Sequence, residues 1–356
     1  PLFNDTATTE IYTAGHSSAA SDVYKRQLMK SSFNLFFSVL TATLFTFIFS
    51  LSTPSISLAD GSPKSFGAWL TLLRKEALGR GIPQQTLDSA LKDLEPVSRV
   101  IELDRNQPEA KLTFDQYLSR ILSEERIARG RKKLTDSRRM LAKIADTYGV
   151  QPRFLVALWG IETDFGRVTG SFPVIDSLVS LVYDGRRSSF FRKELFHALR
   201  ILDEGHISLA RMKGSWAGAM GQSQFMPSTF RHFAVDFDGD GRIDIWESQE
   251  DVFASAANYL SQSGWMRGQT WGQEVLLPEG ADLALTEFKQ PKSPSDWWSL
   301  GVSTLDGSDF LSPGLLSSIV QPEGFKDRAF LVYNNYHVIH KWNRSNNFAL
   351  SVGILS

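Results

Sequence analysis

The complete absence of cysteine limits how this chain can be stabilised. It excludes disulfides, thiolate zinc sites, iron–sulfur clusters, a cysteine nucleophile and a lipid-carrying cysteine. Apolar residues make up 42% of the 356 residues, which is enough for a substantial hydrophobic core. We therefore expect a globular protein that is held together by apolar burial and whose chemistry uses oxygen, amide and aromatic groups.

The charges are nearly balanced, with 38 Lys and Arg against 39 Asp and Glu. Binding to nucleic acid through phosphate contacts relies on clustered positive charge, so we expect no nucleic-acid partner. The sequence lacks HExxH, GxSxG and Walker motifs, and its six histidines form no metal or triad pattern. Metalloprotease, serine-hydrolase and nucleotide-dependent functions are therefore disfavoured, and we expect no organic cofactor.

The N-terminal residues are not expected to belong to the folded protein. Residues 1–28 lack apolar periodicity and resemble translated sequencing-adapter read-through, with a disordered native leader as the alternative. Residues 29–59 follow the pattern of a signal peptide: Met29 and Lys30, an apolar run at 34–50, and Ser-Leu-Ala before Asp60. An uncleaved membrane anchor is the alternative. We expect export and, after cleavage, a mature chain with no stable membrane anchor.

The mature chain is predicted to be mainly α, with an α+β organisation. Residues 60–149 show helical spacing, as in the stripe of Phe66, Trp69, Leu70 and Leu73. Residues 150–262 alternate short helices with Gly-rich loops, and residues 263–329 favour a small β-rich subdomain with a strand at 273–278. Residues 330–356 return to helical spacing. The absence of a helix-stop signal at the end suggests a truncated C-terminus.

A glutamate lies on the apolar stripe of a predicted helix that begins at Pro152. Glu162 shares this stripe with Leu158, Trp159 and Phe165, at helical spacings of four and three residues. Burial disfavours an ionised carboxylate and raises its pKa, as a general acid near neutral pH requires. The alternative is a salt-bridged glutamate at a helix edge.

A Gly-rich loop at 213–230 combines glycines with amides and apolar side chains. Gln222 and Gln224 offer amide groups, and Phe225 and Met226 offer apolar contact. The loop lacks the lysine of a phosphate-binding loop, so its composition suits an uncharged polar ligand such as a sugar. Taken alone, it is equally compatible with a packing loop.

Together these segments resemble the family B membrane-bound lytic murein transglycosylases, which are lysozyme-like enzymes that cut peptidoglycan. The matching segments, in order, are WGIETDFG (159–166), YDGRRSSFFRKEL (183–195), GSWAGAMGQSQFMPS (214–228), the acidic loop near 240 with ANYL (257–260), and KWNRSNNFALSVG (341–353). The resemblance implies a lysozyme-like catalytic core with an additional helical domain, peptidoglycan glycan strands as the substrate, and Glu162 as the only acid/base.

The resemblance also implies a set of substrate-binding residues. They are Ser215, Gln224, Phe225, Met226, Tyr117, Tyr259, Asn343 and the basic pair Arg186 and Arg187. Tyrosines at helical spacing are also common in cores, and an arginine pair is also common in solvated turns. The resemblance also implies a periplasmic location. We further expect a monomer, with cell-wall synthesis or hydrolysis proteins as candidate partners.

The segment DFDGDGRIDIWE (236–247) fits a 12-residue calcium loop. Its predicted ligands are Asp236, Asp238, Asp240, the Arg242 carbonyl, Asp244 and Glu247. In the resembling family the last ligand can come later, so Asp251 competes with Glu247. Oxygen ligands favour Ca²⁺, and a single loop suggests a structural ion. The alternative is an acidic turn without metal.

The sequence allows three functions, and the family resemblance favours the first of them. The first is a lytic transglycosylase that forms 1,6-anhydro-N-acetylmuramic acid ends. The second is a lysozyme-like hydrolase that uses water, and the third is a non-catalytic glycan-binding scaffold.

Overall fold

The computed structural model describes residues 65–106, 113–281, 290–322 and 328–356. The predicted leader (1–28) and signal peptide (29–59) lie outside these residues. Within them helices dominate and strands are short, which confirms the predicted mainly α fold class. None of the helices in the described ranges is long and apolar enough to cross a membrane.

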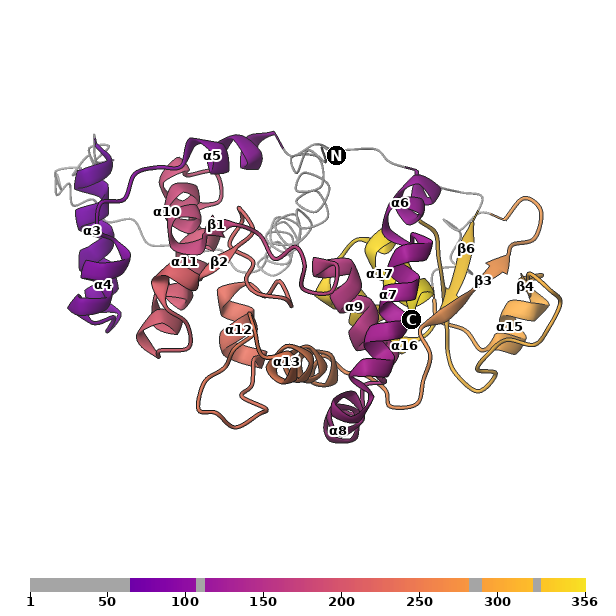
Figure 1. The fold of residues 1–356 in the computed structure, drawn as a ribbon. Coiled ribbons are helices and arrows are strands. Elements are labelled where there is room, and N and C mark those ends of the chain that lie inside the picture. Colours follow the sequence, from indigo (N-terminus) through magenta and orange to yellow (C-terminus); the bar gives the residue numbers. More distant parts are fainter. Residues whose placement is uncertain (1–64, 107–112, 282–289, 323–327) are drawn as a thin grey trace, which may run out of the picture.

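One end of the molecule is a helical group that combines distant parts of the sequence (Figure 1). Its members are α3 (Phe66–Gly79), α4 (Gln84–Ala90), α5 (Ser98–Arg105), α10 (Val174–Asp184) and α11 (Ser188–Asp203). Helix α5 packs on α10, and α4 packs on α11. The Ser65 side chain caps α3 by accepting a hydrogen bond from the Ala68 N–H, and Pro83 precedes α4.

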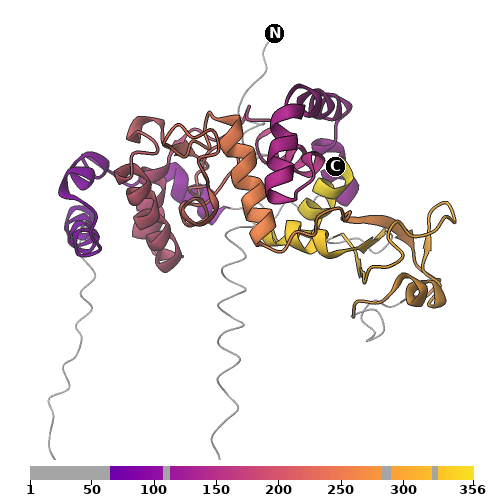
Figure 2. The ribbon, with the colours of Figure 1, turned by 90° about the horizontal axis from the view of Figure 1, so that it is seen from below.

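A second helical group surrounds α9 (Pro152–Thr163), which carries Glu162. Its other members are α6 (Phe114–Ile121), α7 (Glu124–Asp136), α8 (Arg138–Tyr148), α13 (Gln249–Gln262) and α17 (Asn346–Leu355). Figure 2 shows α13, in orange, running between the two groups. The helices of predicted domain 60–149 are thus divided between both groups, because each buries its apolar stripe against different later helices.

A four-stranded antiparallel sheet forms the opposite end of the molecule (Figure 1). Its spatial order is β4 (Ser303–Thr304), β3 (Gly272–Leu276), β6 (Ala329–Val332) and β5 (Ser318–Val320). Helix α15 (Pro294–Ser299) contributes Trp297 to a small separate core with Val275, Phe310 and Leu331. Strands β3, β4 and β5 lie within the range 263–329 that was predicted to be β-rich, and β6 extends beyond it. Strand β3 includes most of the predicted strand.

The C-terminal segment begins differently from the prediction. Phe330, Leu331 and Val332 belong to β6 and not to a helix. Their short apolar run pairs with both β3 and β5, so backbone hydrogen bonding to the sheet replaces the predicted helical turn. Helix α16 (Asn334–Trp342) starts only afterwards, and α17 then packs on α9 and α6.

A Gly-rich loop connects the two helical groups. Strand β2 (Lys213–Gly214) pairs with β1 (Phe172–Pro173), and the chain then turns through Met220 and Phe225, which form an isolated bridge. Helix α12 (Pro227–Phe233) follows and packs on both α11 and α13. The loop is therefore fixed by both helical groups next to α9.

Candidate active site

Glu162 lies within one turn of the C-terminal end of α9, a helix in the middle of the molecule (Figure 1). Its side chain is buried, with the residue 6% exposed. Burial raises the pKa of Glu162 to about 8, and a hydrogen bond from Trp342 opposes this rise. The carboxyl group is therefore neutral at pH 7 and able to donate a proton.

The indole of Trp342 contacts this carboxyl group directly. Its Nε1 donates a hydrogen bond to Oε1 of Glu162 over 2.7 Å. Trp342 ends α16, which follows the sheet, so the C-terminal segment completes the site. Trp342 is not among the predicted site residues, since nothing local to either residue indicates this pairing.

Helix α9 ends in a tight left-handed turn. Asp164 and Phe165 have positive φ angles of 49° and 60°, which non-glycine residues seldom adopt. The Asp164 carboxylate accepts hydrogen bonds from Arg126 at 3.3 Å and Arg129 at 2.8 Å, and it forms an ion pair with Arg167 at 3.3 Å. These ion pairs keep Asp164 engaged and fix the end of the helix that carries Glu162.

Gln222 anchors the other side of α9. Its Oε1 accepts a hydrogen bond from Trp159 Nε1 at 2.8 Å, and its backbone carbonyl accepts one from the Thr163 hydroxyl at 3.0 Å. A Cβ on Gly166, where φ is 80°, would lie 2.3 Å from this Oε1, so the close approach requires glycine. A buried tryptophan usually needs a hydrogen-bond acceptor for its indole N–H. The position of Trp159 on the apolar stripe of the helix is therefore the sequence signal that could have indicated an acceptor such as Gln222.

The predicted loop residues pack near one another, and their polar groups bind the backbone. Ser215 is buried, and its hydroxyl accepts a hydrogen bond from the Ala219 N–H at 3.0 Å. Gln224 adopts a positive φ of 49°, and its Nε2 donates to the carbonyls of Thr169 at 3.0 Å and Gly221 at 2.8 Å. These contacts hold the loop in one shape.

An aromatic cluster surrounds Trp342. The ring centre of Tyr259 lies 4.9 Å from that of Trp342 in a T-shaped contact, and the ring centre of Phe225 lies 5.3 Å away. Asn343 follows Trp342 and is buried, while Met226 forms the N-cap of α12. Phe225 and Tyr259 thus pack against the indole that donates to Glu162.

Other predicted residues have different surroundings. Arg186 and Arg187 both pair with Asp104 of α5, with Arg186 Nε 2.6 Å from Oδ2. The hydrogen bonds from these arginines hold the pKa of Asp104 below its usual value, against burial. Part of their charge is thus neutralised within the protein. Tyr117 lies half-buried on α6, a helix that packs on α17.

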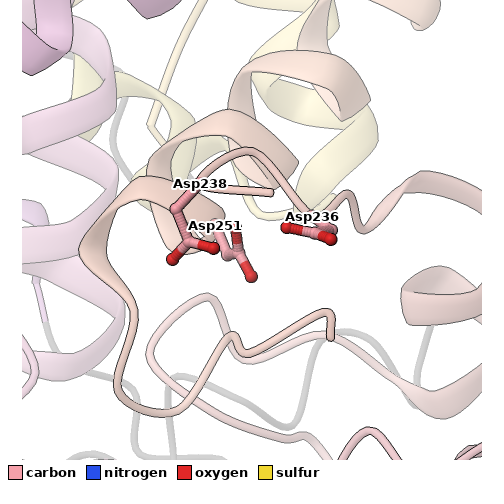
Figure 3. A group of neighbouring side chains, drawn as sticks. All are labelled: Asp236, Asp238 and Asp251. Carbon is pink, nitrogen blue, oxygen red and sulfur yellow. The ribbon is translucent and has the colours of Figure 1, made fainter. Parts of the chain in front are cut away.

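Two carboxylates of the acidic loop and one from the first turn of α13 converge on one point. Oxygen atoms of Asp236, Asp238 and Asp251 all lie within 4.8 Å of one another (Figure 3). Backbone N–H groups of Gly239 and Gly241 donate to the two Asp236 oxygens at 2.7 and 2.9 Å, which shapes the loop around them. This oxygen donor set fits a hard divalent cation such as Ca²⁺.

The remaining predicted metal ligands have other partners. Glu247 forms an ion pair with Arg211, and Asp240 forms one with Arg242 at 3.2 Å. One oxygen of the buried Asp244 accepts hydrogen bonds from the N–H groups of Trp246 at 2.9 Å and Glu247 at 2.8 Å. Of the two alternatives for the last ligand, the geometry therefore favours Asp251.

Known proteins are similar to this chain in sequence and fold. The chain is 28% identical over 287 residues to membrane-bound lytic murein transglycosylase B of Escherichia coli K12, covering 76% of this chain and 77% of that protein. Its fold matches SltB3 from Pseudomonas aeruginosa, solved in complex with NAG-anhNAM-pentapeptide, with a TM-score of 0.78 and 42% identity over 82% of this chain and 78% of that one.

A further match is the Escherichia coli lytic transglycosylase Slt35, solved in complex with calcium. Its TM-score is 0.68 at 26% identity, over 83% of this chain and 93% of that one. Residues 65–356 match the family description "Transglycosylase SLT domain". The chain thus belongs to the SLT-domain transglycosylase family, as the sequence motifs predict.

Proposed function

We propose that this protein is a lytic transglycosylase that cleaves the β-1,4 bond between N-acetylmuramic acid and N-acetylglucosamine in peptidoglycan. The observation that carries the proposal is the buried Glu162 with its pKa raised to about 8, hydrogen-bonded to Trp342. This group is protonated when substrate arrives at neutral pH. It can therefore act as a general acid without a second ionisable residue to keep it neutral.

The reaction needs one carboxyl group in two roles. Glu162 gives its proton to the glycosidic oxygen as the bond between that oxygen and C1 of the muramic acid breaks. The ionised Glu162 then takes the proton of the C6 hydroxyl of the same sugar, and O6 bonds to C1. The product is a 1,6-anhydro ring, the catalyst regains its proton, and no water is consumed.

The surroundings of the neighbouring acid support a single-carboxylate mechanism. Glycosidases that use two carboxylates place both across the scissile bond, one as the acid and one as a nucleophile or base. Asp164 follows Glu162 closely, but its carboxylate is held by Arg126, Arg129 and Arg167. These ion pairs compensate the charge of Asp164 and fix the end of α9. SltB3, a relative, was solved with a ligand that contains an anhydro sugar.

We assign substrate contacts to the loop and aromatic residues around Glu162. These are Ser215, Gln224, Phe225, Met226, Tyr259 and Asn343, with Tyr117, Arg186 and Arg187 further along the glycan strand. Phe225 and Tyr259 are favoured by their contacts with Trp342. Arg186 and Arg187 already form ion pairs with Asp104. A substrate carboxylate would therefore share these two arginines with Asp104.

A bound Ca²⁺ would be held by Asp236, Asp238 and Asp251 and would supply structural stability. The Ile245 carbonyl of the acidic loop accepts a hydrogen bond from the Gln222 N–H, and the Trp246 carbonyl accepts one from Gln222 Nε2, both at 2.8 Å. Gln222 in turn holds Trp159 on α9. The acidic loop thus supports α9, which carries Glu162, through one residue, Gln222. We further propose that the protein acts in the periplasm after export.

Mass spectrometry of digested cell-wall sacculi tests the function. We expect muropeptides with 1,6-anhydro ends. Reducing ends without the anhydro ring would instead establish the hydrolase. Glu162→Gln should lower the rate at least a thousandfold, because a general acid contributes about 10²–10⁴-fold and this residue serves as both acid and base. Unchanged cleavage by this variant would refute the assignment, and binding without cleavage by the wild type would establish the scaffold.

A further inference from the structure

The hydrogen bond between Trp342 and Glu162 has a direction that the chemistry of the two groups fixes. An indole N–H is a donor only, so Oε1 of Glu162 is the acceptor. We propose that Trp342 is a positioning residue that fixes Oε1 as the accepting oxygen, so that Oε2 carries the proton delivered to the glycosidic oxygen. The inference rests on the proposed function insofar as Glu162 is the acid of that reaction.

The two oxygens of a neutral carboxyl group differ in their ability to accept a hydrogen bond. One oxygen is a hydroxyl and the other a carbonyl, and the carbonyl oxygen is the stronger acceptor. A donor at 2.7 Å from Oε1 therefore favours the form in which Oε1 is the carbonyl and Oε2 bears the hydrogen. Only one of the two oxygens is then prepared to donate before substrate binds.

The indole is itself held in place from two sides. The Tyr259 ring on α13 packs against it at 4.9 Å, and the Phe225 ring from the Gly-rich loop lies at 5.3 Å. The Tyr259 hydroxyl also donates to the carbonyl of Lys341 at 3.0 Å, which fixes the end of α16. A donor fixed before the reaction starts costs no reorganisation when charge develops on the acid.

The same hydrogen bond tunes the strength of the acid. Burial raises the pKa of Glu162 to about 8, and the Trp342 N–H lowers it relative to burial alone, because the donor stabilises the ionised form. The carboxyl thus remains protonated at pH 7, while its conjugate base is still stabilised in the buried site.

Several charged groups on the elements packed against α9 have partners of their own. On α7, Arg126 and Arg129 pair with Asp164, and Lys133 lies 5.4 Å from the ring centre of Trp159. On α8, Lys143 lies over the ring of Phe237.

On α13, Asp251 binds backbone N–H groups of the acidic loop. The sequence of α17 contains no ionisable side chain. Removal of the indole N–H should therefore raise the pKa of Glu162, because this hydrogen bond lowers it.

The test is Trp342→Phe, which keeps an aromatic ring and removes the N–H. The Glu162 carboxyl is followed by ¹³C NMR titration, its signal being identified by its loss in Glu162→Gln. We expect the titration midpoint to rise by roughly one pH unit, since a hydrogen bond to a charged group is lost. The alkaline limb of kcat/KM should move upward with it. We expect kcat to fall about tenfold to a hundredfold with KM almost unchanged, because the acid is misplaced.

Two controls separate this from a packing effect. Trp298→Phe removes the indole of a tryptophan that is 54% exposed and should leave the midpoint unchanged. Benzothienylalanine at position 342 keeps the bicyclic shape, replaces the N–H with sulfur and should reproduce the shift even if Trp342→Phe does not fold. A midpoint that stays at the wild-type value in this isosteric variant overturns the inference. The titration needs no turnover, so a failure of the proposed reaction would be seen separately, as absent anhydro products from the wild type.

Discussion

Gln222 accepts a hydrogen bond from the indole Nε1 of Trp159 over 2.8 Å, three residues before Glu162 on the same helix. The other end of the Gln222 amide donates to the Trp246 carbonyl in the acidic loop, also at 2.8 Å. One buried amide thus satisfies two polar groups and connects the predicted metal loop to the helix that carries the acid.

Replacement of this amide should therefore destabilise the protein. Gln222→Ala leaves the buried Trp159 N–H without its acceptor and should lower the free energy of unfolding by about 1–3 kcal/mol. Urea unfolding followed by circular dichroism measures the change. Gln85→Ala on the exposed face of α4 is the matched control and should change stability by less than about 0.5 kcal/mol. Equal stability of both variants would show that the amide link is not important.

The raised pKa of Glu162 predicts how activity depends on pH. Only the protonated group can act as the acid, so kcat/KM should fall as pH rises through about 8. The measurement is the initial rate on purified glycan strands between pH 5 and pH 10. An activity that instead falls away near the ordinary glutamate pKa of 4.5 would contradict the predicted protonation state.

The same shift has a consequence for stability. The folded carboxyl keeps its proton up to about pH 8, while the unfolded one releases it near 4.5, so the folded state binds more protons in this interval. The free energy of unfolding should therefore decrease as pH rises from about 4.5 to about 8. Glu162→Gln cannot ionise, so it should lack this contribution and be more stable than the wild type at pH 8. The measurement is the free energy of unfolding of both proteins at several pH values between 4.5 and about 8. If the two plots of this free energy against pH were parallel, they would contradict the prediction.

Removal of Asp164 should be costly because three arginines depend on it. Asp164→Ala leaves Arg126, which is buried, without its carboxylate, and breaking a buried ion pair costs about 3–5 kcal/mol. The control is Asp136→Ala, which breaks the exposed pair with Lys132 and should cost less than about 1 kcal/mol. Chemical denaturation of both variants gives the comparison, and similar losses would show that burial of the pair is unimportant.

Calcium should raise the melting temperature if the three converging carboxylates bind it. Free Ca²⁺ at a hundred times its Kd would add about 2.7 kcal/mol, or roughly 5 °C. Thermal melts with EGTA and with added Ca²⁺ measure the shift. Asp251→Asn should abolish the calcium-dependent shift, and Glu247→Gln should retain it, because Glu247 pairs with Arg211. The opposite pattern would make Glu247 the last ligand.

Local sequence patterns predicted the parts of the site that local structure determines. The stripe that contains Glu162 appears in the sequence because an α-helix places every third or fourth residue on one face. Asp236 and Asp238 were predicted from the spacing of a 12-residue loop. That spacing is local, because the loop carboxylates accept hydrogen bonds from the loop's own backbone. The last ligand could not be chosen, because the ion pair between Arg211 and Glu247 joins separate segments.

Contacts between distant segments were not predictable from one sequence. The pairing of Trp342 with Glu162 spans 180 residues, and it depends on how α16 leaves the sheet. The sequence predicts a helix at the residues that form β6, because a short apolar run is compatible with either a helix or a strand. Its pairing partner β3 lies far away in the chain and gives no local signal. Asp104 likewise showed no sequence relation to Arg186, which it binds.

The position of Trp342 late in the chain also determines when the active site can exist. Glu162 is synthesised well before α16, so a growing chain has the carboxyl group without its indole donor. Only after the last helices have folded onto α9 are the acid and its hydrogen-bond partner together. An enzyme that cuts the wall of its own cell would in this way reach full activity only as a finished molecule.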